Sequence, residues 1–145
     1  MRLHKNLVLA VINGLNQIFN EEKYADKVVA QLLKSDKRWG SRDRGFIAET
    51  TYEIVRWKRL YATIADVQEP FNRNDFWRIF AVWATLRGYP LPDWNALDGT
   101  PTRRIKGKFE ELRTDRKLRA SIPDWLDALG SSALRDEKST KEIHA

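Results

Sequence analysis

Cysteine is absent from this 145-residue chain, which excludes disulfides, thiolate metal sites and a cysteine nucleophile. The seven glycines are scattered singly, so no glycine-rich loop is present that could cradle a phosphate or a dinucleotide. The only two histidines, His4 and His144, stand near opposite ends, and neither has an acidic pair at metal-ligand spacing. The sequence therefore predicts no metal site and no catalytic residue within this chain.

Long apolar runs are also missing. The first predicted helix contains an apolar run from Leu7 to Ile12, whereas roughly 20 residues are needed to span a bilayer. Asn13 and Gly14 interrupt that stretch, and no small-residue cleavage site of a signal peptide follows. Together with the lack of cysteine, this predicts a soluble, cytoplasmic protein with no membrane partner.

Positive charge is what the chain has in excess. The formal net charge is +6 and the sequence pI is about 9.7. Residues 1 to 61 hold 12 Lys/Arg against 7 Asp/Glu, and residues 103 to 119 hold 8 against 3. Such zoning is expected of a surface that binds a polyanion, but a solvated helix face produces much the same pattern, so charge alone leaves both interpretations open.

Apolar residues recur with helical spacing through the first half of the chain, and no convincing alternating strand is present. We expect an all-α bundle whose helices cover residues 3 to 19, 24 to 37, 41 to 61, 74 to 87 and 102 to 118. Tyr24 is expected in the core. The helix about 41 to 61 carries apolar side chains around almost its whole circumference, which predicts a nearly all-buried central helix.

The predicted domain organisation is simple. Residues 1 to 120 form one helical domain, which includes a loop at 88 to 101 that holds three prolines. The stretch "SIPDWLDALG", residues 121 to 130, has its own start and stop signals. We therefore expect residues 121 to 145 to be a short helical extension or the start of a linker.

The stretch "WGSRDRGF", residues 39 to 46, places two arginines at a predicted helix N-terminus, where positive charge is disfavoured. Asp43 suits that position, and we expect Arg44 to act with it as a structural clamp that reaches a carboxylate on another helix. Arg42 shares a polar stripe with Glu49, Glu53 and Arg56, which we expect to form an exposed row of ion pairs rather than a dicarboxylate site. Arg42 is also a candidate phosphate contact.

Two further basic clusters are candidates for nucleic-acid binding. Arg56, Lys58 and Arg59 stand at the end of the predicted helix 41 to 61, where the helix dipole also favours cations. The cations at the start of the next basic helix are Arg103, Arg104, Lys106 and Lys108. Among the six tryptophans, Trp39 and Trp94 lie near predicted loops and are the candidates for stacking on unpaired bases.

Three segments together resemble a known family: "YADKVVAQLLK" (24 to 34), "WGSRDRGFIAETTYEIVRWKRLY" (39 to 61) and "SIPDWLDALG" (121 to 130). They are similar to the N-terminal region of bacterial ribosomal RNA cytosine-5 methyltransferases of the Sun type. In that family a helical domain similar to the antitermination factor NusB precedes a catalytic domain that uses S-adenosylmethionine. The resemblance implies a NusB-like bundle and ribosomal RNA as the partner.

The catalytic cysteines and the cofactor loop of that family have no counterpart here, and the chain stops at "KEIHA" as a new element begins. The resemblance therefore implies an RNA-binding or RNA-positioning domain of a longer methyltransferase active in rRNA processing. This chain would hold no cofactor; S-adenosylmethionine would belong to a missing catalytic domain, itself a second expected partner. Two alternatives stay open: a stand-alone antitermination-like adaptor that binds RNA and protein, and a helical protein–protein interaction module.

Overall fold

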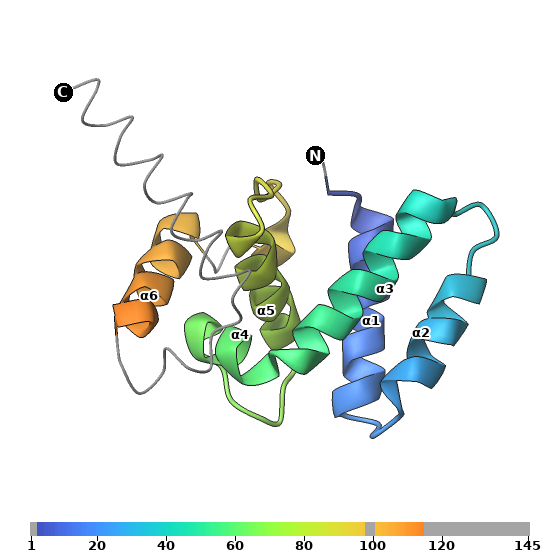
Figure 1. Cartoon of the computed structure of the whole chain (residues 1–145), viewed down its shortest axis with the longest axis horizontal. Helices are drawn as coiled ribbons and strands as arrows, with labels where there is room; N and C mark the ends of the chain where they lie inside the picture. The colour runs from blue at the N-terminus through green and yellow to red at the C-terminus, as the bar shows by residue number, and fades with distance from the viewer. Residues whose placement is uncertain (1–2, 98–100, 115–145) are drawn as a thin grey trace.

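The computed structural model describes residues 3 to 97 and 101 to 114, and within these ranges the chain is all-helical, with six α-helices and no strand. The all-α prediction is confirmed. The α-helices in chain order are α1 (Lys5–Phe19), α2 (Ala25–Lys34), α3 (Ser41–Arg56), α4 (Lys58–Ala65), α5 (Arg73–Leu86) and α6 (Thr102–Thr114), with a short 3-10 helix η1 (Asn95–Leu97) before α6. From right to left in Figure 1, the helices lie in the order α2, then α1 with α3, then α5 with α4, then α6.

The most buried helix is α5. It buries ten of its 14 residues, and Phe76, Phe80 and Val82 are completely inaccessible to solvent. The helices α1, α3, α4 and α6 all pack against it, as does η1. A helix that is apolar around its whole circumference can be stable only with neighbours on every side, and α5 has them.

The expected nearly all-buried central helix at about 41 to 61 is wrong in two respects. Its buried residues are only Ile47, Thr50, Thr51 and Ile54, and Tyr52 is 41% exposed. The helix also ends at Arg56, because the backbone turns at Trp57 (φ −111°, ψ 30°) and α4 starts at Lys58. The apolar residues after Trp57 therefore face the core from α4. A projection that treats residues 41 to 61 as one continuous helix assigns them to the wrong faces.

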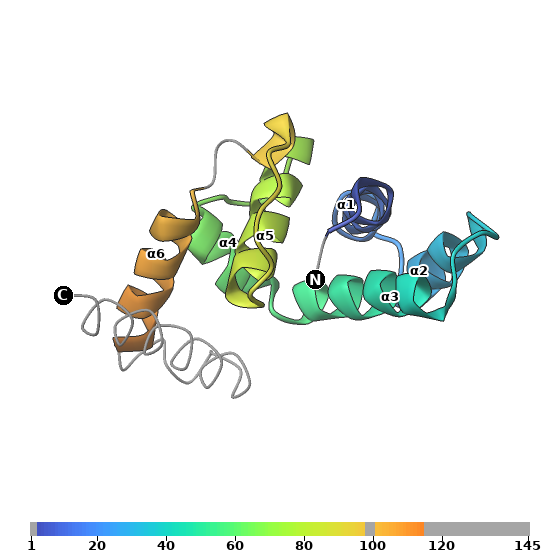
Figure 2. The ribbon, with the colours of Figure 1, turned by 90° about the horizontal axis from the view of Figure 1, so that it is seen from above.

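The helices α1, α2 and α3 pack together at one end of the molecule, and Figure 2 shows α1 nearly end-on with α3 crossing below it toward α4. Gly14 allows the close approach of α1 to α2, since a Cβ atom there would lie 2.7 Å from Leu32 Cδ1. Tyr24, expected in the core, is instead 76% exposed at the N-cap position of α2. The burial of α2 begins at Val28, so the predicted apolar arc starts one turn too early.

The entry to α5 shows a complete capping box. The Asn72 side chain accepts a hydrogen bond from the Asp75 backbone N–H, and the Asp75 carboxylate accepts one from the Asn72 N–H, so the helix starts at Arg73. The basic helix α6 lies against α4 and α5, and its buried residues Ile105, Phe109 and Leu112 recur four and three residues apart, which places them on one face of the helix. The predicted unit at 121 to 130 and the extension at 121 to 145 lie outside the described residues.

Within the described ranges, no helix combines the length and apolarity needed to cross a membrane.

Candidate nucleic-acid interface

The turn at Trp57 gathers three of the predicted RNA-binding cations around one hollow. Arg56 ends α3, while Lys58 and Arg59 begin α4, and all three line a depression of about 570 Å³ together with Trp57. The remaining lining residues are Val55, Leu60, Thr63 and Leu112. Cations thus stand around a partly apolar surface that carries a half-buried indole ring.

The three cations differ in their contacts with other side chains of the protein. The Lys58 ammonium forms an ion pair with Glu69 and lies 5.2 Å from the centre of the Phe19 ring. The Arg56 guanidinium is exposed and lies 5.3 Å from the centre of the Trp57 ring. Arg59 is exposed, and no carboxylate in the described part of the chain pairs with Arg56 or Arg59. Arg56 and Arg59 are therefore available to an anion, whereas Lys58 is held by internal contacts.

Helix α6 packs against α4 with its last turns beside this hollow, whereas Arg104, near the start of α6, lies at the other end of α4. Leu112 of α6 forms part of the hollow's wall, and Arg104 lines a small depression beside α4 with Asp66 and Arg78. Arg103, Arg104 and Lys108 are exposed, and Lys106 is half-buried. The segments 56 to 59 and 103 to 108 come from opposite halves of the sequence, and the tertiary fold places the helices that carry them next to each other.

Arg42 stands apart from these cations. It lies in the first turn of α3, and Arg56 lies in its last turn, about 21 Å away along the helix axis. Its exposed side chain lines a separate groove between α1, α3 and the end of α5. The structure therefore places the predicted cations at two sites, not on one continuous patch.

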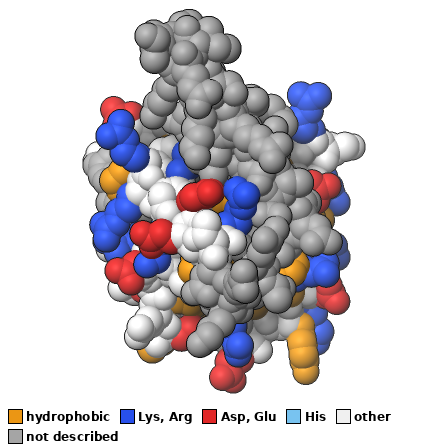
Figure 3. Space-filling view, turned by 60° about the vertical axis from the view of Figure 1, so that its left-hand side comes forward, with side chains coloured by type: hydrophobic (Ala, Val, Ile, Leu, Met, Phe, Trp, Pro, Cys, Tyr) orange, Lys and Arg blue, Asp and Glu red, His pale blue; other side chains and the backbone are white. Residues whose placement is uncertain are grey.

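The space-filling view agrees with this separation. On the face shown in Figure 3, Lys and Arg side chains appear at several places with Asp and Glu side chains between them. The described cations on this face therefore do not form one uninterrupted patch.

Arg44 contacts α2, but its partner differs from the one expected. The Arg44 Nη1 atom donates a hydrogen bond to the backbone carbonyl of Leu33 at 2.9 Å, not to a carboxylate. The last carbonyls of a helix lack intrahelical partners and carry the negative end of its dipole, which explains the choice. Asp43 is half-buried beside the groove, and no side-chain hydrogen bond caps the first turn of α3.

The expected row of ion pairs along α3 is also wrong. Glu53 is drawn inward and pairs with Arg87 at the end of α5, with Oε2 and Nη2 2.9 Å apart. Burial raises the pKa of the neighbouring Tyr61 hydroxyl, and the negative charge of Glu53 raises it further. The α3 stripe is therefore divided: Arg42, Glu49 and Arg56 are exposed, while Glu53 joins α3 to α5.

The two tryptophans predicted to stack on bases are half-buried and pack against the core, as Trp57 does. Trp94 lies edge-on to Trp77 with ring centres 6.4 Å apart, and the Trp39 indole nitrogen is buried without a hydrogen-bond partner in the described ranges. Trp57, which a continuous helical projection places on a buried face, is the one that lines a cationic hollow. In the sequence, the position of Trp57 between Arg56 and Lys58 is the feature that could have indicated an indole ring beside cations.

Comparison with known proteins gives no relative: no family model, no curated protein and no solved structure matches this chain. Within the described residues, no group of three or more His, Asp or Glu side chains is placed to hold a metal ion. The site is thus defined by its own residues: exposed arginines, one half-buried indole and the α6 cations.

Proposed function

We propose that this chain is the RNA-binding domain of a ribosomal RNA cytosine-5 methyltransferase that uses S-adenosylmethionine, and that it positions RNA in the cytoplasm without methylating it. The proposal takes its family from the resemblance of residues 24 to 34, 39 to 61 and 121 to 130 to Sun-type enzymes. The observation that carries RNA binding is the hollow at the α3–α4 turn, where Arg56 and Arg59 flank Trp57 without carboxylate partners in the described ranges.

The chemistry of that hollow suits a nucleic-acid backbone. Guanidinium groups form paired hydrogen bonds to phosphate oxygens, and a partly exposed indole ring offers a face on which a base or ribose can lie. Interactions of this kind supply affinity and position but little choice of sequence. Arg103, Arg104 and Lys108 are exposed on α6, which packs against α4, and offer further phosphate contacts beyond the hollow.

Binding to a fluorescent single-stranded ribosomal RNA fragment, measured by anisotropy between low and moderate salt, tests this function. We expect affinity to fall steeply with salt, because each neutralised phosphate releases condensed counterions. An affinity that stays flat, or no measurable binding, contradicts the proposal. Dimerisation or capture of a protein partner in the absence of RNA affinity would select the protein–protein module instead.

The methyltransferase part of the proposal has a separate test. The gene should continue past Ala145 into a glycine-rich cofactor motif and a Pro-Cys active site. A gene that encodes this helical domain alone would instead select the stand-alone adaptor that binds RNA with a protein partner.

A further inference from the structure

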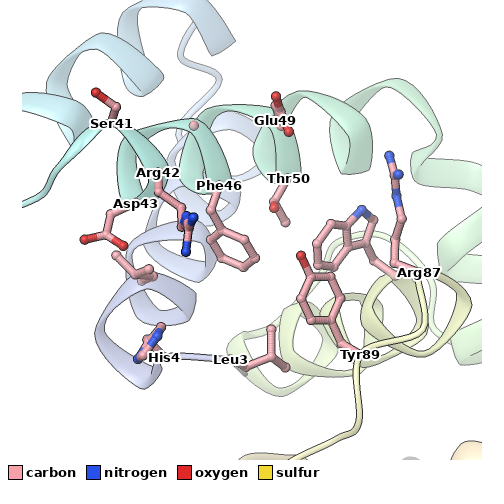
Figure 4. A pocket seen from close by; sticks show the side chains of 13 residues that line it. Leu3, His4, Ser41, Arg42, Asp43, Phe46, Glu49, Thr50, Arg87 and Tyr89 are labelled. Atoms are coloured by element: carbon pink, nitrogen blue, oxygen red, sulfur yellow. The ribbon is translucent and has the colours of Figure 1, made fainter. Parts of the chain in front are cut away.

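A second site is the groove that α1, α3 and the end of α5 enclose around Arg42. Its volume is about 760 Å³, within the roughly 300 to 1,000 Å³ typical of ligand pockets. Figure 4 shows Arg42, Phe46 and Thr50 projecting from α3 into the groove, with Leu3 and Tyr89 on the side opposite α3. The groove is distinct from the cationic hollow at Trp57, because no residue lines both.

Three aromatic rings form one wall of this groove. The Phe46 and Trp83 rings meet edge to face with centres 5.8 Å apart, and Tyr89 stacks on Trp83 at 5.5 Å. Phe46 and Tyr89 also meet edge to face at 6.3 Å. Trp83 is only 4% exposed, whereas Phe46 and Tyr89 are half-buried. The buried indole thus fixes two rings that remain partly open to solvent.

The charges around the groove are mixed. Arg42 is exposed without a carboxylate partner in the described ranges, and His4 stands on the α1 side. Asp43 and Glu49 also line the groove, and Arg87 is already paired with Glu53. Charges that nearly cancel do not make a track for a phosphate backbone. These charges suit a ligand whose anionic end binds Arg42 and whose amino or imino groups donate hydrogen bonds to the carboxylates of Asp43 and Glu49.

We propose that this groove holds one unpaired nucleotide of an RNA strand, with its base against Phe46 and Tyr89 and its phosphate at Arg42. This inference rests on the proposed RNA-binding function and adds to it a preference for single-stranded over duplex RNA. Stacking requires a base whose face is free, which a paired base inside a helix does not offer. The hollow at Trp57 binds phosphates, and the groove binds a base.

Photocrosslinking of the full chain tests the inference directly. The probe is a uridine-rich 12-nucleotide RNA that carries 5-iodouridine, irradiated in complex with the protein and mapped by mass spectrometry. We expect crosslinks in the peptides that contain Phe46, Trp83 or Tyr89. Crosslinks that map only elsewhere overturn the proposal, and because the wild-type chain is used, this result does not depend on the folding of a variant.

Affinity measurements give a second, independent readout. Tyr89→Leu should weaken binding of the single-stranded 12-mer at least about fivefold, because stacking of a base on an aromatic ring typically contributes that much or more. Binding of a duplex of the same length should stay unchanged. Tyr24→Leu is the matched control, since Tyr24 is 76% exposed on α2 and does not line the groove. Circular dichroism should show that both variants are folded.

The remaining outcomes separate the two proposals. If the wild-type chain binds neither RNA, the proposed function fails and this inference fails with it. If binding is salt-dependent but Tyr89→Leu affects single-stranded and duplex RNA equally, only the groove inference fails. If uridine monophosphate binds as tightly as the 12-mer, the groove belongs to a free nucleotide and the assignment to an RNA strand is overturned.

Discussion

The Arg44 guanidinium donates a hydrogen bond to the carbonyl oxygen of Leu33, 2.9 Å away, and so joins the first turn of α3 to the last turn of α2. A cation in the first turn of a helix opposes the dipole of that helix, but here it lies at the negative end of another helix. This hydrogen bond therefore joins α2 to α3 beside the turn that carries Arg42.

Replacing Arg44 should therefore destabilise the fold, whereas replacing Arg42 should not. We expect Arg44→Gln to lower the free energy of unfolding by about 1 kcal/mol, the net contribution of a typical hydrogen bond. Arg42→Gln should leave it within about 0.5 kcal/mol of the wild type, because Arg42 is exposed and no described carboxylate pairs with it. Urea denaturation measures both. A destabilised Arg42 variant beside an unaffected Arg44 variant would contradict this assignment.

The capping box of α5 gives a second stability prediction. Asn72→Ala removes the acceptor for the Asp75 N–H and should cost about 1 kcal/mol of unfolding free energy. Asn74→Ala is the control, since Asn74 is exposed in the same turn without a capping role. Thermal melting of the two variants compares them. Equal melting temperatures would show that the cap contributes nothing measurable.

Tyr61 predicts a change of stability with pH. Its ring is fully buried on α4 and its hydroxyl has no hydrogen-bond partner in the described ranges, so Tyr61→Phe should raise the unfolding free energy by about 1 kcal/mol at neutral pH. Burial raises the pKa of Tyr61 in the folded chain, and the charge of Glu53 adds to this effect. Above the ordinary tyrosine pKa of about 10, the unfolded chain therefore loses a proton that the folded chain keeps.

The unfolding free energy of the wild type therefore falls as pH rises through this range. Tyr61→Phe lacks the titrating hydroxyl, so this contribution to the fall is absent from the variant. The difference in unfolding free energy between the two proteins should widen between about pH 9 and pH 11, on either side of the ordinary tyrosine pKa, measured by urea denaturation at each pH. The two proteins differ only at residue 61, so the contributions of all other groups cancel in the comparison. A constant difference would mean that the Tyr61 hydroxyl reaches water.

The hollow at Trp57 predicts how RNA binding responds to removal of its cations. A double Arg56→Gln and Arg59→Gln variant should bind single-stranded RNA more weakly, and the slope of log affinity against log salt should become shallower by about 0.7 for each phosphate that the variant no longer neutralises. Lys34→Gln with Lys37→Gln removes the same charge from the end of α2 and the segment after it, and is the control because both side chains are exposed and line neither the hollow nor the groove. If both pairs weaken binding equally, only net charge matters and the hollow is not the site.

The amino-acid sequence by itself determined the helical class, the apolar stripe of α6 and the surplus of cations, because each depends on spacing and composition along a single segment. It also placed Arg56, Lys58 and Arg59 next to one another, since they are consecutive or nearly so. What it could not predict was the turn at Trp57, because the local pattern of apolar residues continues through it. Because the predicted helix is broken at Trp57, the most buried helix of the bundle is α5 and not the segment 41 to 61.

Only the tertiary structure decided the partners of the charged side chains. Glu53 pairs with Arg87, 34 residues away, and Lys58 at the start of α4 pairs with Glu69 in the connection between α4 and α5. It also brought Phe46, Trp83 and Tyr89 to one groove from two helices and a loop. The physical reason is that helical periodicity fixes the face on which a side chain lies, whereas the helix opposite that face is set by the packing of the whole core.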